Sequence, residues 1–491
     1  MSCHARTHRG PIALALLGGL AASCASTHSD EVAGFRESWH SGDAEAAMRA
    51  LDGQIAESAG VDAGLVRSTN ALDSRIDTNR GDTCLFLMER GMVSLAQGQL
   101  QDAIDLFIRG RDGLDARLNS DFGSYFTDIT SSLYDEAATD YSGADYEHLL
   151  VRSMLSLADL VAGDGQAETY AFQFIEKQEE ILGMTYDVEG VDYEPRQQYE
   201  RVAFGHYLRG VLDEREGGTD VEQIYGLASQ YSGHGVELIE ASLQRVTEGE
   251  RWAEPGHGVL HVFALAGRGP YLEEKEVDGT GEVVTALAQI GLAVAQQSGT
   301  PLAQDRVPVP GVVRKDATIS PVSVSVDGQS HSTESILDLN AIAEQQLEAN
   351  EPMVTARAVV RRSLISAGID EVEDRSGFSM GGVGLGLNLG KTMRERADTR
   401  SWESLPAEIH AARIELPAGE HEITIGGETR RVNIRAAQDS FALLVQPNLS
   451  RSGFLYFDPA SMVMEPEPTE EVAEEAAEEA TEEAAAEPAG E

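Results

Sequence analysis

Cysteine and lysine are scarce in this sequence, and proline is nearly absent from its first half. Only 3 of the 491 residues are cysteine, and the four lysines are Lys177, Lys275, Lys315 and Lys391. Pro195 is the only proline between Pro11 and Pro255, which favours helices there because proline interrupts them. Beyond the N-terminal stretch, no run of 18 uninterrupted apolar residues occurs, so we expect no membrane-spanning helix.

Basic residues are also few compared with acidic ones. Lys and Arg total 37 against 83 Asp and Glu, and the formal net charge is −46. Nucleic-acid binding depends on cations that displace phosphate counterions, so we expect no nucleic acid among the partners. Residues 465–491 contain 12 Glu and no basic residue. This composition predicts an acidic, disordered Glu/Ala tail over residues 461–491.

The N-terminus carries a secretion signal. Arg6 and Arg9 precede a short apolar stretch that ends in Leu20-Ala21-Ala22-Ser23-Cys24. A basic start, a short apolar run and small residues are typical of a signal peptide. The ending resembles the lipobox of bacterial lipoproteins, which implies that residues 1–23 are removed and that Cys24 becomes the lipidated first residue. The alternative is an ordinary secretory signal cut nearby.

The residues around Cys24 predict a location. Ala25 rather than Asp follows it, which by analogy with enteric sorting rules favours the outer membrane, facing the periplasm. We expect residues 24–32 to form a linker and the lipid to be the only contact with the membrane. Once Cys24 carries lipid, Cys84 is the single remaining thiol, so no internal disulfide is possible. Its apolar run, residues 84–88, predicts a buried, inert thiol.

Residues 33–250 have helical periodicity. Around the turn Gln97-Gly98-Gln99, the small residues Gly91, Ala103 and Gly110 would let two antiparallel helices approach closely, and Phe107 would fill the space toward the next pair. This spacing resembles a tetratricopeptide repeat. Two further hairpins are predicted, with turns at residues 163–165 and 216–218. The alternative is a non-repetitive helical bundle.

The pattern changes after Pro255. We expect strands at 258–265, 322–326, 411–416, 420–425, 430–436 and 440–446, and helices at 282–297 and 335–367. The predicted fold is therefore α+β: an N-terminal, tetratricopeptide-like helical repeat domain at 33–250, followed by a mixed α/β domain at 256–460.

Three motifs suggest chemistry, and each has a simpler explanation. Residues 377–381 match G-x-S-x-G around Ser379, with Asp398 and His410 or His421 behind it, but the acidic residues 370–375 cannot form the buried strand that a nucleophile elbow needs. The glycines of 381–390 do not match G-x-G-x-x-G, and they are better explained by a flexible or closely packed segment. His257 and His261 lie on a predicted strand, about 13 Å apart, too far to share a metal ion. We therefore expect no catalytic, metal or cofactor site.

Residues 397–406, Ala-Asp-Thr-Arg-Ser-Trp-Glu-Ser-Leu-Pro, are the densest run of special residues. We expect Trp402 to be the buried anchor of a loop that plugs an edge of the second domain's sheet. Asp398 and Arg400 would hold this loop by charge-assisted hydrogen bonds.

This run resembles a family of uncharacterised conserved bacterial lipoproteins with a helical-repeat first half. The resemblance covers roughly residues 75–450. Within this range it also rests on residues 141–147, 267–275, 333–335, 356–358 and 416–419, with Pro352, Arg361 and Arg413. It implies an envelope protein with a link to cell-wall assembly, and no catalytic residues.

These observations favour a lipid-anchored, non-catalytic scaffold that binds an envelope protein partner through its helical repeats. The structural and interaction residues would be Gly91, Ala103, Phe107, Asp398, Arg400 and Trp402, with Cys24 as the lipid attachment site. The alternatives are an envelope hydrolase that uses the second domain and a lipoprotein that binds the cell wall or a polysaccharide.

Overall fold

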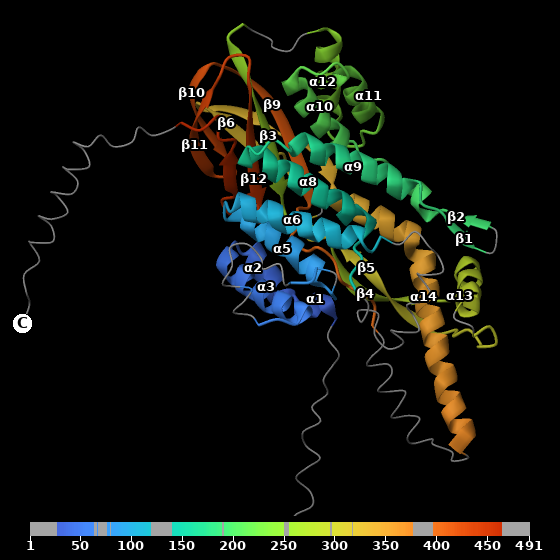
Figure 1. Cartoon of the computed structure of the whole chain (residues 1–491). Helices are drawn as coiled ribbons and strands as arrows, with labels where there is room; N and C mark the ends of the chain where they lie inside the picture. The colour runs from blue at the N-terminus through green and yellow to red at the C-terminus, as the bar shows by residue number, and fades with distance from the viewer. Residues whose placement is uncertain are drawn as a thin grey trace, which may run out of the picture.

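The structure is a computed structural model. It describes residues 27–62, 66, 76–78, 80–118, 140–188, 191–249, 255–294, 297–316, 318–376 and 396–463. The fold is mixed α+β, with most helices in the first half of the chain and the main sheets in the second (Figure 1). In the part of the chain that the structure describes, no helix is both long enough and apolar enough to cross a membrane.

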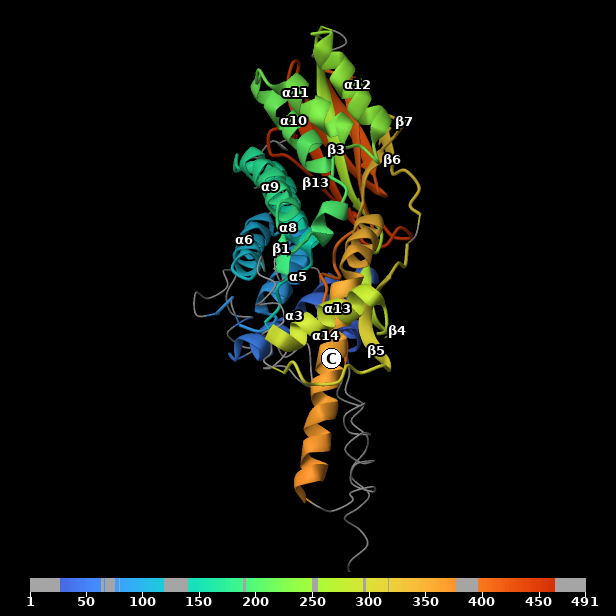
Figure 2. The same cartoon turned by 90° about the vertical axis from the view of Figure 1, so that its right-hand side faces the viewer.

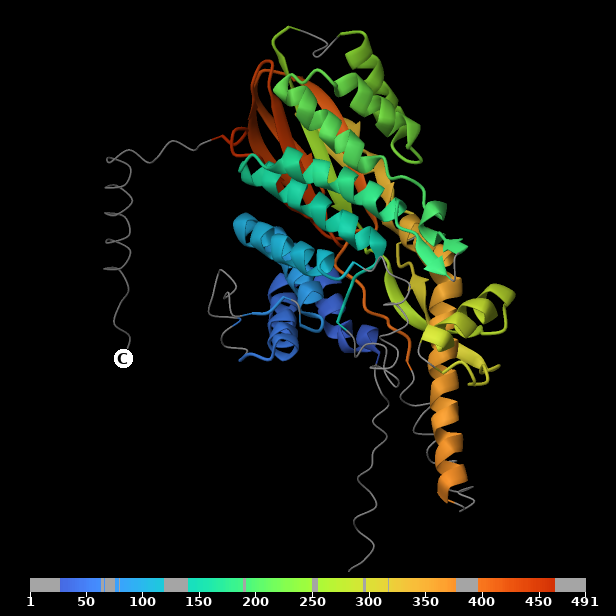
Figure 3. The same ribbon diagram turned by 45° about the vertical axis from the view of Figure 1, so that its right-hand side comes forward.

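The helices of the first half stack in chain order. They are α1 (His28–Glu31), α2 (Ala33–His40), α3 (Ala44–Ala59), α5 (Thr83–Ala96), α6 (Leu100–Asp115), α8 (Asp145–Ala162), α9 (Ala167–Leu182), α10 (Phe204–Glu216), α11 (Val221–Gln230) and α12 (Val236–Thr247). From α2 to α12, each of these helices packs on the next one along the chain, and Figure 3 shows this series beside the sheet. Between α9 and α10 lie β1 (Tyr186–Val188), β2 (Val191–Tyr193) and the 3-10 helix η3 (Pro195–Gln198).

Short glycine-containing turns connect the predicted hairpins. Gly98, Gly163 and Gly217 all have φ between 75° and 78°, a left-handed conformation that glycine adopts without steric cost. The hairpins α5/α6 and α8/α9 lie where the sequence predicts them. In the third, the expected single helix after Gly218 is divided into α11 and α12, and the break precedes Gly235, which has φ 65°.

Two β-sheets and a two-stranded ribbon form the second half. The five-stranded sheet has the order β13-β12-β3-β9-β8, from β13 (Phe454–Phe457), β12 (Asp439–Gln446), β3 (His257–Ala266), β9 (Glu408–Pro417) and β8 (Glu334–Asp338). Its β3 and β12 are parallel, and its other neighbours are antiparallel. The four-stranded sheet contains β11 (Glu428–Ile434), β10 (Gly419–Ile425), β6 (Ser323–Val326) and β7 (Gln329–Ser332). The ribbon pairs β4 (Tyr271–Asp278) with β5 (Arg306–Val313).

Two helices lie beside the ribbon. They are α13 (Glu282–Val294) and α14 (Leu339–Ser376). The helix expected at 335–367 is wrong at its start, because residues 335–338 belong to strand β8, and α14 continues through Pro352 to Ser376. The C-terminal part of α14 projects beyond the other labelled elements (Figure 2).

The five-stranded sheet is the middle layer of the molecule. Along β3, Phe263 and Leu265 belong to a core shared with the helices, while Val262 and Ala264 belong to a second core shared with the four-stranded sheet. This alternation follows from the two-residue period of a strand. The helices at 33–250 and the sheet at 256–460 therefore bury apolar side chains in one common core.

The predicted boundaries differ from the structure at both ends. Thr27–Val32, expected to be part of a linker, forms the capped helix α1, with Ser29 buried against the body. Residues 461–463, expected to begin the tail, are folded, because Met462 bridges to Val432 and Ser461 accepts a hydrogen bond from the Asn433 amide. Residues 464–491 and Cys24 lie outside the described residues.

Candidate functional site

Residues 396–407 run in a largely irregular conformation between the helices and the sheet, and we call them the 396–407 segment. An irregular buried segment must find hydrogen-bond partners for its backbone outside any ladder. Here side-chain carboxylates of other elements supply them. Glu274 on β4 accepts from the amide of Ala397 at 2.9 Å, and two glutamates on the helices accept from the centre of the segment.

Glu89 on α5 is the first of these glutamates. Its two carboxylate oxygens accept from the amides of Glu403 at 2.6 Å and Ser404 at 3.0 Å, and one of them also accepts from the Ser404 hydroxyl. The side chain is buried, and desolvation raises its pKa well above the usual range. Hydrogen bonds from the segment thus replace the water that this carboxyl loses.

Glu147 on α8 has the corresponding role one hairpin later. Its Oε1 accepts from the Trp402 amide at 2.8 Å, and its Oε2 accepts from the Ala144 amide at 3.1 Å and from the Tyr141 hydroxyl. Burial also raises the pKa of Glu147. Two consecutive hairpins therefore bind the backbone of one continuous peptide.

The side chain of Trp402 has no exposed surface. Its ring centroid is 5.9 Å from that of Phe107 on α6, and its Nε1 donates to Ser404 Oγ at 3.0 Å. The contact with Phe107 places the Trp402 ring against helix α6, rather than at the edge of the sheet where we expected it. Edge strand β8 pairs with β9 in the antiparallel direction, with a register shift between Ser335 and Leu337, and the segment fills the space beside α5, α6 and α8.

Gly91 makes the position of Phe107 possible. A Cβ atom placed on Gly91 would lie 2.5 Å from Cε1 of Phe107, and Phe107 has no exposed surface. Ala103, one turn earlier on α6, is also fully buried. Gly91, Phe107 and Trp402, which are far apart in the sequence, therefore form one packed series from α5 through α6 to the segment.

Gly91→Ala should destabilise the protein by up to about 2 kcal/mol. Alanine gains about 1 kcal/mol in helix propensity, but the overpacking against the Phe107 ring costs about 1–3 kcal/mol. The control is Gly53→Ala in α3, where no atom lies within 4 Å of an added Cβ, and this variant should be stabilised by up to about 1 kcal/mol. Urea unfolding of both variants measures whether the free energy of unfolding falls in Gly91→Ala and rises in Gly53→Ala. Equal stabilisation by both would show that Phe107 can move aside.

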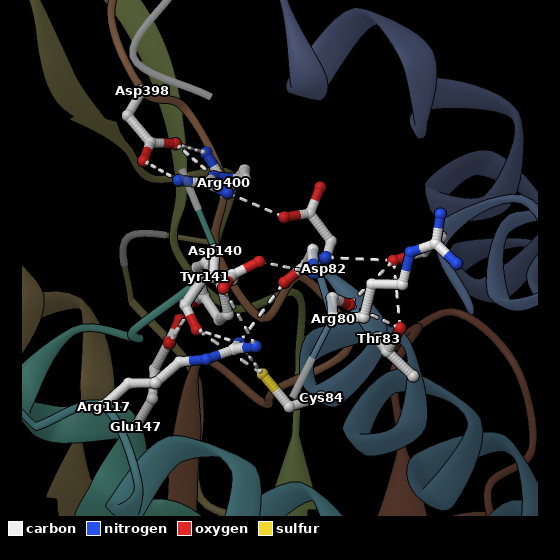
Figure 4. A network of polar contacts seen from close by, with 12 residues as sticks. Arg80, Asp82, Thr83, Cys84, Arg117, Asp140, Tyr141, Glu147, Asp398 and Arg400 are labelled. Carbon is white, nitrogen blue, oxygen red and sulfur yellow. Dashed lines mark hydrogen bonds and ion pairs between the residues drawn. The ribbon is translucent and has the colours of Figure 1, made fainter. Parts of the chain in front are cut away.

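Asp398 and Arg400 hold the start of the segment, and Figure 4 shows their network. Arg400 donates from Nε to Asp398 Oδ1 at 2.8 Å and from Nη2 to Asp398 Oδ2 at 2.6 Å. Its Nη1 donates to Asp82 Oδ1 at 2.7 Å. Asp82 is the residue before α5 and makes no side-chain cap of that helix. Its carboxylate thus joins the first helical hairpin to the segment.

Behind this network the thiol of Cys84 is buried, as its apolar run predicts. Desolvation raises its pKa to about 11, so it stays a thiol at neutral pH and is a poor nucleophile. Arg117 donates to the carbonyl oxygens of Tyr141 at 2.8 Å and Gly81 at 3.3 Å beside it (Figure 4).

The N-terminal helices close the other side of the segment. The Ser29 amide donates to Thr399 Oγ1 at 3.2 Å. Arg36 on α2 donates from Nη1 to both carboxylate oxygens of Glu403 at 2.7 Å. His28 stacks on Phe86 of α5 with ring centroids 5.8 Å apart, and desolvation lowers the pKa of His28 to about 4.

Stability should fall in mild acid partly through His28. Because the folded-state pKa of about 4 lies below the ordinary value of 6.5, the unfolded chain binds the proton first, and stability is lost as the pH drops from 6.5 toward 4. Between pH 7 and pH 5 this single group should lower the free energy of unfolding by about 2 kcal/mol. Urea unfolding at pH 7 and pH 5 measures this change. The drop in unfolding free energy between the two pH values should be about 2 kcal/mol smaller in His28→Gln than in the parent protein. An identical loss in both proteins would contradict the assignment to His28.

The residues of the hydrolase hypothesis are not brought together by what the structure describes. Ser379 and the glycines of 381–390 lie outside the described residues. Asp398 is bound to Arg400, whereas His410 on β9 pairs with Thr333 Oγ1 at 3.2 Å and Glu408 Oε2 at 3.0 Å. His421 contacts Asp327 at 2.7 Å on the exposed hairpin side of β10.

The histidines of β3 are the other pair that the sequence suggests, as metal ligands. His257 and His261 are both on this strand, and His261 Nε2 lies 3.0 Å from Asp439 Oδ1. Among the described residues, no group of three or more His, Cys, Asp or Glu side chains has the geometry of a metal site.

The sequence analysis missed Glu89 and Glu147. A detectable signal was the position of Glu89 directly after the apolar run 84–88, inside a helix in which the preceding residues are all buried. It also missed a cavity of about 210 Å³ between α8, α14 and the β4/β5 ribbon. Comparison with protein-family models, with curated proteins and with solved structures finds no match to this chain.

Proposed function

We propose that this chain is a lipid-anchored protein of the bacterial cell envelope that acts as a non-catalytic scaffold for a protein partner. In this proposal Cys24 carries the lipid, the outer membrane holds the protein on its periplasmic side, and the hairpins α5/α6, α8/α9 and α10/α11 are of the tetratricopeptide type. The resemblance of residues 75–450 to envelope lipoproteins supports a partner that takes part in cell-wall assembly.

One observation supports the scaffold function most directly. Two successive hairpins bind the backbone of an extended peptide through Glu89 and Glu147, and the peptide is the chain's own 396–407 segment. Binding extended peptides along one face is how stacked helical repeats recognise their partners. Since this face is filled from within, the partner would bind the outward helices α6 and α9.

The exposed side of α9 fits such a contact. Phe172 is a large apolar side chain with 40% of its surface exposed, and the guanidinium of Arg209 lies 4.9 Å from its ring centroid. Gln173, next to it, accepts from Arg111 of α6 at 3.1 Å, so the two outer helices form one continuous surface. Aromatic residues and arginine are the side chains most enriched at energetic centres of protein interfaces.

The test is site-specific photocrosslinking in cells. A benzophenone amino acid at position 172 should give one dominant adduct, and the same probe at the exposed Glu422 of β10, on the opposite layer, should give none. The purified adduct partner should then bind the parent protein and bind Phe172→Ala at least tenfold more weakly. No adduct at 172, equal adducts at both positions, or unchanged affinity of Phe172→Ala would overturn the proposal.

Cys24→Ala should release the protein from the membrane fraction into the soluble periplasmic fraction. In this proposal the lipid is the anchor, and no described helix can span a bilayer. Fractionation followed by immunoblotting measures the shift, and Cys84→Ala provides the matched control, since Cys84 is buried. Membrane retention of the Cys24→Ala variant at the level of the control would refute the anchor.

A further inference from the structure

The cavity of about 210 Å³ lies at a junction of three parts of the chain that are far apart in sequence. The first turn of α8 forms one wall, the middle of α14 a second, and the ends of the β4/β5 ribbon a third. It is larger than the roughly 150 Å³ cavities that accommodate benzene in engineered proteins. A single substituted ring is therefore the size of molecule that it can hold.

The walls of the cavity are mostly apolar. Tyr146, Tyr199 and Tyr271 contribute aromatic rings, and the aliphatic residues are Leu118, Leu272, Val312, Leu347, Met353 and Val354. Small-molecule sites typically combine such walls with a few polar groups that fix the orientation of the ligand.

Asp145 and Arg400 at the cavity are already in ion pairs, and the carboxyl of Glu147 is occupied by three hydrogen-bond donors. Asp145 accepts from Arg196 Nε at 2.8 Å and from the Tyr199 hydroxyl at 2.8 Å. Arg400 is bound by Asp398 and Asp82. A charged ligand would have to break one of these buried pairs or remain unpaired itself, and both are unfavourable. The cavity therefore favours an uncharged molecule.

At the cavity, the hydroxyls of Ser401 and Tyr146 make no hydrogen bond to the described residues. Tyr146 is only 5% exposed, and its hydroxyl makes no hydrogen bond to any described residue, whereas the hydroxyls of Tyr199 and Tyr271 each donate to a carboxylate. Ser401 Oγ is fully buried, whereas the Tyr146 hydroxyl oxygen keeps some accessible surface, so this oxygen is free to bond a molecule in the cavity. The backbone amide of Tyr146 is fixed by Gln346 Oε1 of α14 at 2.8 Å, so the residue is held in place at the cavity wall.

We propose that this cavity binds a small, uncharged molecule with one apolar ring and one hydrogen-bonding group, and that the Tyr146 hydroxyl is the partner of that group. The binding needs neither the lipid anchor nor the outer face of α9. It gives the chain a second recognition site, for a small molecule, separate from its surface for a protein partner.

The experiment compares phenol with toluene, which lacks the hydroxyl, and with benzoate, which is charged. We expect saturation-transfer NMR and calorimetry on the folded, lipid-free protein to give a dissociation constant for phenol of roughly 0.1–1 mM. Toluene should bind several-fold more weakly, and benzoate should not bind. Tyr146→Phe should weaken phenol about threefold to tenfold and leave toluene unchanged, because only the hydrogen bond is lost.

Cavity-filling variants locate the binding. Ala343 is buried at the cavity wall, while Ala341 on the same helix is exposed. Ala343→Leu should weaken both phenol and toluene more than tenfold, and Ala341→Leu should change neither. If Ala343→Leu unfolds, Val354→Phe tests the same wall. Absence of phenol binding at 10 mM, undiminished binding to a folded cavity-filling variant, or unchanged phenol affinity of Tyr146→Phe would overturn the proposal.

Discussion

Trp402→Ala should lower the free energy of unfolding by about 3–5 kcal/mol, the usual range for emptying a buried aromatic site. The side chain has no exposed surface, and it lies against Phe107 of α6. Its removal would leave a cavity between the first hairpin and the 396–407 segment. Urea unfolding followed by circular dichroism measures the loss.

Trp402→Phe is the matched control. It keeps a ring beside Phe107 but loses the donor to Ser404 Oγ, so we expect roughly half the loss or less. If Trp402→Ala lowered the free energy of unfolding by less than about 1 kcal/mol, the segment would be able to rearrange and fill the site. Trp402 would then not be the structural anchor of the segment.

Glu89→Ala should lower the free energy of unfolding by about 3–9 kcal/mol. It would leave three buried donors without an acceptor, namely the amides of Glu403 and Ser404 and the Ser404 hydroxyl, and each such group costs about 1–3 kcal/mol. The same urea assay measures the change, and protection of the 403 and 404 amides from hydrogen exchange should fall in parallel.

The control for this loss of charge is Glu176→Ala on the exposed side of α9. A surface substitution of this kind should stay within about 0.5 kcal/mol of the parent. Equal stability of Glu89→Ala and Glu176→Ala would mean that the amides of residues 403 and 404 have other hydrogen-bond acceptors. The role of Glu89 in binding the backbone of the segment would then be wrong.

Much of the secondary structure can be predicted from the sequence because it depends on local periodicity. The helical spacing around Gly98 and Gly163 predicts two hairpins, and the alternation at 322–326 and 420–436 predicts strands of the four-stranded sheet. The start of α14 could not be placed, since Ile336 and Leu337 fit a helix or a strand equally well, and their pairing with distant β9 decides.

The β4/β5 ribbon escaped prediction for a different reason. Pro308 and Pro310 argue against a strand, because proline cannot donate to a ladder. Pro308 and Pro310 are two residues apart in β5, so the amide donors that they lack would point to the same edge of the strand. In a two-stranded ribbon, β5 pairs with β4 along one edge only, so the other edge needs no donors.

The polar part of the site is the least predictable from the sequence. Asp398, Arg400 and Trp402 form a local pattern that marks the segment as unusual. Glu89 lies 314 residues from Glu403 along the chain, and a single glutamate in a helix is normally on the surface. Only the three-dimensional arrangement reveals that its carboxyl is an acceptor for a peptide from the other end of the chain.

The 396–407 segment also sets the order in which the polypeptide can mature. The hydrogen bond from the Ser29 amide to Thr399 joins residues 370 positions apart in the sequence. The carboxylate of Glu89 likewise accepts from Ser404, far later in the chain. During synthesis the helices emerge first with a buried acidic side chain still unpaired and an aromatic face still uncovered, so their packing cannot be completed until the last fifth of the chain arrives. If the chain is exported, as proposed above, this delay would keep the polypeptide in a state that can pass through a translocation channel. A chain that ended before residue 399 would lack the partners of Ser29 and Glu89, and its helices would leave these groups unpaired.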